Sequence, residues 1–221
     1  ELCAPYRSFC ERRGVTPSSV SDWRQIPAVP TTAFKYFDLV STPYTSISRK
    51  PDAAFYTSGT TLGSERRGRH LVPRESLYRA AFHEPFRRAL LPDVDKIRVI
   101  SLIPSPVAAS HSSLSWMVGM AADAFADEVD WLIQANGEWT KGAFDVLRAA
   151  SEEGAPVLVL GTALAFLHLK EADDEPSVVL PTDSRAMVTG GFKGVRRSVG
   201  RSELYSSITD YMGIASDRIV N

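Results

Sequence analysis

Beyond residue 96 the chain alternates between short apolar runs and longer segments in which apolar residues recur at helical spacing. The short runs are rich in β-branched residues and predict strands at 97–103, 129–133, 157–160, 186–189 and 218–220. The longer segments predict helices at 112–125, 140–153, 162–172 and 202–212. Strands that alternate with helices of about 10–15 residues are typical of a mainly parallel sheet with helices on both faces. We therefore predict a layered α/β fold.

The pattern before residue 97 is less regular. Residues 1–14 favour a short helix closed by Gly14, and prolines interrupt the segment that follows it. Apolar residues at 53–56 predict a strand, and residues 74–91 predict a helix that Pro85 should kink.

Length and composition suit one large α/β domain or two small ones. The chain has 221 residues, of which 44% are hydrophobic and 23% charged, so it can bury a sizeable core. We expect two parts: an N-terminal helix with a proline-rich segment over residues 1–35, and an α/β domain over residues 36–221 that carries the ligand sites.

Charge and hydropathy argue against nucleic acids and membranes as partners. The net charge of -1 gives no electrostatic reason to expect a nucleic acid or an anionic membrane surface. No apolar run approaches the length of a membrane span, and Glu1-Leu2-Cys3 does not resemble the start of a secretory signal. The expected location is the cytoplasm.

The two cysteines, Cys3 and Cys10, are seven residues apart in a predicted helix. Their Cα atoms would be about 10 Å apart by helical rise, which is too far for a disulfide. We therefore expect free thiols, as in a reducing compartment. His70, His83 and His168 have no second ligand at metal spacing, and the cysteines do not pair with them, so we expect no zinc site.

The stretch with the most chemistry is Thr57-Ser58-Gly59-Thr60-Thr61-Leu62-Gly63. It has four hydroxyls and two glycines within seven residues and follows a predicted strand. Backbone N–H and side-chain O–H groups in such a flexible loop can turn together toward one anion, which predicts a phosphate-binding loop. The alternative is an ordinary surface loop, since serine, threonine and glycine are also common there.

Other sequence motifs are excluded by inspection. Gly63 and Gly68 have the glycine spacing of a P-loop, but Arg69-His70 stand where lysine and serine or threonine are required. No G-x-G-x-x-G occurs, and no G-x-S-x-G surrounds Ser58, which argues against a hydrolase nucleophile.

Tyr56-Thr57-Ser58-Gly59-Thr60-Thr61 resembles the phosphate-binding signature of the adenylate-forming (acyl-CoA synthetase and ligase) superfamily. Within it the chain is most similar to LuxE-type acyl-protein synthetases, and the resemblance runs from about Ile26 to Asn221. Three further stretches support it in the expected order: His111 with the apolar segment after it, Leu158-Val159-Leu160-Gly161-Thr162, and Val188-Thr189-Gly190-Gly191-Phe192-Lys193-Gly194.

The resemblance implies an enzyme that uses ATP and Mg²⁺ to activate a fatty acid as an acyl-adenylate. The acyl group would then pass to a protein thiol or another acceptor, so that the partners are a carboxylic acid and an acyl-acceptor protein. Nucleotide binding is implied for Thr57, Ser58, Gly59, Thr60, Thr61, Gly63, Arg66, Arg67, Gly190 and Gly191. The acyl pocket is implied for Gly161, Thr162 and Phe166, with Ala163 and Leu167, and His111 is implied beside the reacting carbonyl and phosphate.

The predicted sheet gives an independent reason to group some of these residues. His111, Gly161-Thr162 and Gly190-Gly191 each follow a predicted strand, and ligands of open parallel sheets bind beyond the carboxyl ends of the strands. Each residue also has a structural alternative. A glycine pair can serve only a tight turn, and a single histidine is more often structural than catalytic.

Two features depart from the family. Leu62 precedes Gly63, and arginines at positions 66, 67 and 69 stand where the superfamily has a lysine. A non-catalytic binding domain that acts with a protein partner is therefore an alternative function, and a small-molecule phosphotransferase is a weaker one. The family places further groups, including a catalytic lysine and the acceptor cysteine, after the position of Asn221. We accordingly expect residues 36–221 to be a truncated nucleotide- and acyl-binding domain, with little activity alone.

Overall fold

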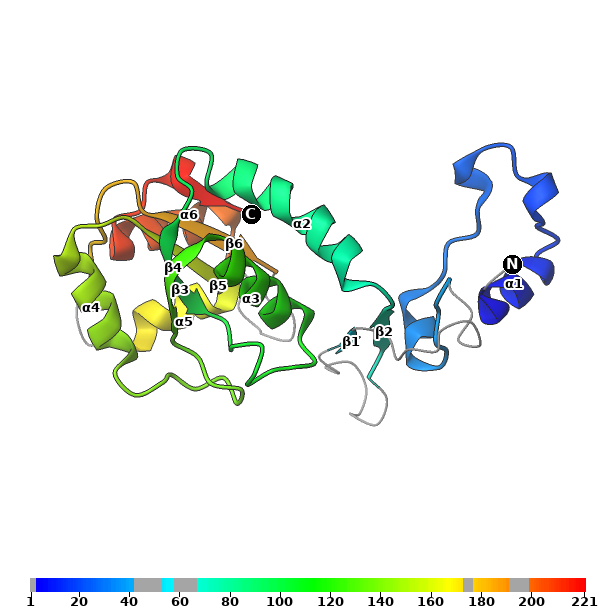
Figure 1. Cartoon of the computed structure of the whole chain (residues 1–221), viewed down its shortest axis with the longest axis horizontal. Coiled ribbons are helices and arrows are strands. Elements are labelled where there is room, and N and C mark those ends of the chain that lie inside the picture. Colours follow the sequence, from blue (N-terminus) through cyan, green and yellow to red (C-terminus); the bar gives the residue numbers. More distant parts are fainter. Residues whose placement is uncertain (1–2, 42–52, 58–66, 173–176, 191–198) are drawn as a thin grey trace. The chain divides into compact units, whose positions relative to one another are not determined.

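The computed structural model describes residues 3–41, 53–57, 67–172, 177–190 and 199–221. The chain divides into two compact units, Glu1–Tyr78 and Arg79–Asn221 (Figure 1). The larger, C-terminal unit contains a five-stranded sheet, and the smaller, N-terminal unit contains a two-stranded one.

All neighbouring strands of the five-stranded sheet are parallel, and their order is β4-β3-β5-β6-β7. Their bounds are β3 Ile97–Leu102, β4 Ala126–Trp131, β5 Val157–Thr162, β6 Arg185–Thr189 and β7 Ile219–Val220. The predicted α/β fold with a parallel sheet is confirmed. The edge strand β4 begins three residues before its predicted start. The prediction missed these residues because the charged Asp127 and Glu128 interrupt the apolar run. An edge strand tolerates such charges.

Helices cover both faces of this sheet (Figure 1). The bounds are α2 Glu75–Leu90, α3 Ser113–Phe125, α4 Ala143–Glu153, α5 Ala163–Ala172 and α6 Arg201–Met212. One buried cluster joins α4, α5 and α6 to one face, and a second joins α3 and the end of α2 to the other. Successive side chains of a strand point to opposite faces of its sheet, so β5 contributes to both clusters. Val157 and Val159 belong to the first cluster, and Leu158 and Leu160 belong to the second.

The helix ends follow from local sequence. Ser112 caps α3 by accepting a hydrogen bond at Oγ from the N–H of Ser115. Gly154 and Gly213, which follow α4 and α6, both adopt the left-handed conformation that glycine takes most easily. The helix α2 continues through Pro85. Among the described residues, no helix is both long and apolar enough to cross a membrane.

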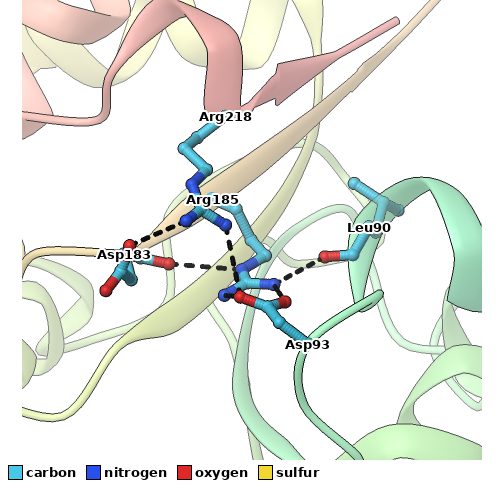
Figure 2. Close-up of polar contacts among 5 residues, drawn as sticks. All are labelled: Leu90, Asp93, Asp183, Arg185 and Arg218. Atoms are coloured by element: carbon cyan, nitrogen blue, oxygen red, sulfur yellow. Dashed lines mark hydrogen bonds and ion pairs between the residues drawn. The ribbon is translucent and has the colours of Figure 1, made fainter.

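A buried arginine holds the amino ends of β6 and β7 (Figure 2). Arg185, the first residue of β6, is 3% exposed and donates to the carbonyl of Leu90 and to the carboxylate of Asp93. Arg218, just before β7, donates to Asp93 and Asp183. The hydrogen bond from Arg185 is the main reason that the pKa of Asp93 falls to about 2. The network fastens the segment after α2 to the sheet.

The N-terminal unit has fewer regular elements. They are α1 Ala4–Glu11, single-turn 3₁₀ helices at Pro17–Ser19, Trp23–Gln25 and Thr31–Lys35 (η1, η2 and η3), and the strands β1 Ala53–Tyr56 and β2 Arg69–Val72. The two strands pair antiparallel, with Phe55 opposite His70 and Tyr56 opposite Arg69. Cys3 and Cys10 are both free, as predicted.

Candidate functional site

The C-terminal unit has an apolar cavity of about 310 Å³ beyond the carboxyl end of β3 and beside the end of β5. The register of the sheet brings these strand ends level, because Leu102 pairs with Gly161 and Gly161 pairs with Val188. The lining residues are Leu102, Ile103, Pro104, Ala109, Ser112, Leu114, Ser115, Ile133, Ala135, Gly137, Trp139, Thr162, Leu164, Ala165 and His168.

Two helices begin at this cavity. The first turns of α3 and α5 both contribute lining residues, which include Leu114 from α3 and Ala165 from α5. Ser112 caps α3, and Thr162 caps α5 by accepting at Oγ1 from the N–H of Ala165 at 3.1 Å. Since the N-terminus of a helix carries a partial positive charge, both helices favour an anionic group at this end of the cavity.

Ser115 places a polar atom at the otherwise apolar wall of α3. Its side chain is 1% exposed, and its Oγ has no hydrogen-bond partner among the described residues. A buried hydroxyl without a partner costs roughly 1–3 kcal/mol. A ligand oxygen or water that reached Ser115 after rotation of its side chain would recover that cost.

The predicted residues Gly161 and Phe166 lie against each other. A Cβ at Gly161 would come within 2.7 Å of Phe166 Cε2 and 3.2 Å of Leu102 Cβ, so only glycine fits without a shift of its neighbours. Phe166 is 4% exposed and belongs to the core cluster on the α4, α5 and α6 face of the sheet. Of the residues predicted for the acyl pocket, Thr162 lines the cavity, whereas Gly161 and Phe166 support the strand and helix beside it.

His111 is exposed and precedes the cap residue of α3. Its neighbours Ala109 and Ser112 line the cavity, but His111 does not. Gly190 directly follows β6 with a φ of +73°, and the space that a Cβ would occupy there is open. This conformation fits the turn that was the structural alternative for the glycine pair. Gly191 lies outside the described residues.

In the N-terminal unit the structure describes Thr57, the first residue of the hydroxyl-rich stretch Thr57–Gly63, and the chain again from Arg67. Ser58, Gly59, Thr60, Thr61, Gly63 and Arg66 lie outside the described residues. Thr57 closes the pairing of β1 and β2: its N–H donates to the carbonyl of Gly68, and its Oγ1 accepts from the N–H of Gly68, both at 2.9 Å. The hydroxyl of Thr57 therefore accepts a backbone hydrogen bond where β1 ends and β2 begins, which we call the base of the hairpin.

Arg67 lies at the same base. Its Nε donates to the carbonyl of Thr57 and its Nη2 to the carbonyl of Tyr56, and its guanidinium lies 5.7 Å from the centre of the Tyr56 ring. These contacts orient the guanidinium beside the end of β1. The side chain remains exposed and able to contact an anion.

The sequence did not identify most of the cavity wall. Leu164, Ala165 and His168 line it from α5, and Ile133 and Trp139 line it from the connection between β4 and α4. Residues 164, 165 and 168 have the spacing of one helix face. The helical pattern of this segment therefore contained a signal for this part of the cavity wall. Nothing local marks Ile133 and Trp139, which meet through an isolated antiparallel bridge.

Within the described part of the chain, no group of three or more histidine, cysteine, aspartate or glutamate residues could hold a metal ion.

Comparisons with protein families, with curated proteins and with solved structures found no match to this chain.

Proposed function

We propose that this chain binds a fatty acid and ATP and belongs to an enzyme that joins them as an acyl-adenylate. The acyl group would pass to a protein thiol or another acceptor, as in LuxE-type acyl-protein synthetases. Free Cys3 and Cys10 fit a cytoplasmic location, which is part of the same proposal.

The observation that carries the proposal is the cavity. The loop that contains His111 and the segment Gly161-Thr162 are far apart in the sequence, and each has lining residues at the same apolar space. Both segments resemble motifs of acid-activating enzymes. Their meeting at one cavity is what a shared acyl site requires.

The size and chemistry of the cavity suit an acyl chain. At about 310 Å³ it has the volume of a small ligand site, for which about 300–1,000 Å³ is usual. Its wall is mainly aliphatic and aromatic, with hydroxyls from Ser112 and Thr162 at the helix starts. An acid with its chain among the apolar residues and its carboxylate toward the N-termini of α3 and α5 would match both parts.

The proposed reaction brings two negatively charged reactants together, so their repulsion must be overcome. A carboxylate oxygen would attack the α-phosphorus of ATP and release pyrophosphate, so two anions must be held in line. Bound Mg²⁺ would neutralise phosphate oxygens. The stretch Thr57–Gly63 would supply backbone and hydroxyl donors to the outer phosphates, and Arg67 would supply a positive charge that is already oriented by β1.

A non-catalytic binding domain is the second candidate. The observation in its favour is that Thr57 Oγ1 and two nitrogens of Arg67 already bond to the hairpin. A protein whose Thr57 and Arg67 are used in this way could keep its fold after losing the reaction. Such a protein would bind a fatty acid and a protein partner without consuming ATP.

Titration of the chain with dodecanoate, with Mg-ATP and with both separates the two candidates. The proposed enzyme binds both ligands and exchanges labelled pyrophosphate into ATP only when acid is present. Replacing Thr60 and Thr61 by alanine should weaken ATP binding and leave dodecanoate binding unchanged. Dodecanoate binding without any ATP binding would favour the binding domain, and release of orthophosphate instead of pyrophosphate would indicate a phosphotransferase.

A further inference from the structure

Lys35 is a cation that the sequence did not connect with the phosphate-binding loop. It is the last residue of η3, and its side chain lies in a depression of about 300 Å³ at the base of the β1–β2 hairpin. The depression is lined by Phe34, Lys35, Tyr36, Phe37, Asp38, Tyr56, Arg67 and Arg69. We call it the basic depression.

Contacts next to Lys35 fix its position. The ring of Phe34 stacks on that of His70 in β2, with centroids 4.2 Å apart. Gly68 also packs closely here, because a Cβ on it would lie 3.6 Å from Phe34 Cβ and 3.1 Å from Thr57 Cγ2. The 3₁₀ helix η3 is thereby held against β2, and Lys35 lies with Arg67 and Arg69 although more than 30 residues separate them in the sequence.

The charges of the basic depression are not balanced. Arg69 forms a two-pronged ion pair with Asp38, which raises the pKa of Arg69. Among the described residues, the hydrogen bonds of the Arg67 side chain go to uncharged carbonyl groups. The Lys35 side chain has no hydrogen bond or ion pair with any residue in the described ranges. Three cations thus share one carboxylate, and the depression would attract an anion.

We propose that the basic depression binds a diphosphate group, with Lys35 and Arg67 as its principal ligands. The choice of diphosphate rests on the proposed function, in which this group is either free pyrophosphate or the outer phosphates of ATP. Lys35 supplies a positive charge that the hydroxyl-rich stretch lacks at the position where the family has a lysine.

Position and chemistry favour this ligand. Thr57 and Arg67 flank residues 58–66 in the sequence, and the basic depression is lined by Tyr56 and Arg67 beside these two positions. A diphosphate has enough oxygens to accept from an ammonium and a guanidinium at once, and such charge-assisted hydrogen bonds are stronger than neutral ones. A single carboxylate carries one negative charge and would not balance the two cations.

The test is calorimetric titration of the 221-residue chain with inorganic pyrophosphate in the presence of Mg²⁺. Lys35→Gln should weaken binding about tenfold or more, because one charge-assisted contact is lost. Lys35→Arg should restore most of it. Lys141→Gln is the matched control, because Lys141 is an exposed lysine of the other unit and lies outside the depression. Melting temperatures should agree among the variants, since Lys35 makes no polar contact with the described residues.

A comparison of ligands identifies the source of the diphosphate. If the outer phosphates of ATP are bound, Lys35→Gln weakens both ATP and pyrophosphate but leaves AMP unchanged. If only free pyrophosphate is bound, ATP affinity does not change. An equal loss for AMP, an unchanged pyrophosphate affinity in Lys35→Gln, or no pyrophosphate binding by the wild type would each overturn the proposal.

The inference and the proposed function can fail separately. Pyrophosphate binding that depends on Lys35, in a chain that binds no fatty acid, would keep the basic depression and remove the acyl-adenylate function. Acid-dependent exchange of pyrophosphate into ATP that is the same in wild type and Lys35→Gln would keep that function and remove Lys35 from it.

Discussion

At the scale of single residues, Gly161 determines how closely α5 can approach the sheet. The Phe166 ring occupies the space of a side chain at this position, and Leu102 limits movement on the other side. We predict that Gly161→Ala lowers the free energy of unfolding by about 1–3 kcal/mol, because the added methyl overpacks a buried contact. Chemical denaturation measures the change.

Two variants make the prediction about Gly161 specific. Gly200→Ala should change stability little, because its φ is -64° and no atom lies within 4 Å of the added Cβ. Adding Phe166→Leu to Gly161→Ala should cost less than the sum of the two single changes, since the smaller side chain removes the clash. Strict additivity of the two changes would contradict this account.

Asp93 should make stability depend on pH. Its pKa in the folded protein is about 2, below its ordinary 3.8, so the ion pair stabilises the fold fully above pH 4 and loses its effect as the pH falls through about 2. Asp93→Asn should lower the free energy of unfolding by about 1–2 kcal/mol at pH 7, a moderate loss because the Asp93 side chain is 45% exposed. The difference between wild type and variant, measured by urea denaturation, should shrink between pH 4 and pH 2. A difference that is constant over this range would refute the role given to the Arg185–Asp93 pair.

At the scale of elements, α5 separates the core from the cavity. Phe166 is buried in the core, whereas Ala165 packs against the edge of that core and also lines the cavity. We predict that Ala165→Trp fills the cavity and weakens dodecanoate binding about tenfold or more, while the fold remains intact. Lys170→Trp is the control, because it adds the same ring at an exposed position of the same helix. Unchanged dodecanoate binding in Ala165→Trp would mean that the acyl chain binds elsewhere.

Most helices and strands could be predicted because their hydrophobic periodicity agrees with their packing. Residues 157–160 form a continuous apolar run, and the strand there is buried on both faces. The strand β2 was missed because Arg69-His70-Leu71-Val72 is short and half charged, and its partner β1 is reached across the hydroxyl-rich stretch. Its stability depends on tertiary contacts, such as that of Phe34 with His70, which no local pattern reveals.

The candidate site was less predictable than the fold. Sequence position alone brought Thr162 and the loop before α3 to the carboxyl edge of the sheet, because parallel strands end on the same side. It could not assign the two faces of α5, since Phe166 and Ala165 are both apolar and the choice depends on which face meets the sheet. Lys35 was missed for a different reason, because it joins Arg67 only through the packing of Phe34 against β2.

At the scale of the whole molecule, the two units carry different parts of the proposed chemistry. The N-terminal unit has the hydroxyl-rich stretch and the basic depression, which suit phosphates. The C-terminal unit has the apolar cavity at the edge of the sheet, which suits an acyl chain. The account therefore requires that the N-terminal unit binds phosphates and that the C-terminal unit binds an acyl chain.

The most direct test is calorimetric titration of the chain with a stable acyl-adenylate analogue, in which a sulfamate joins a dodecanoyl group to adenosine. We predict that this analogue binds at least about 100-fold more tightly than either AMP or dodecanoate, because linking the two groups makes the second contact intramolecular. Ala165→Trp should remove most of that gain. An analogue that binds no more tightly than the better of its two halves would contradict the proposed function.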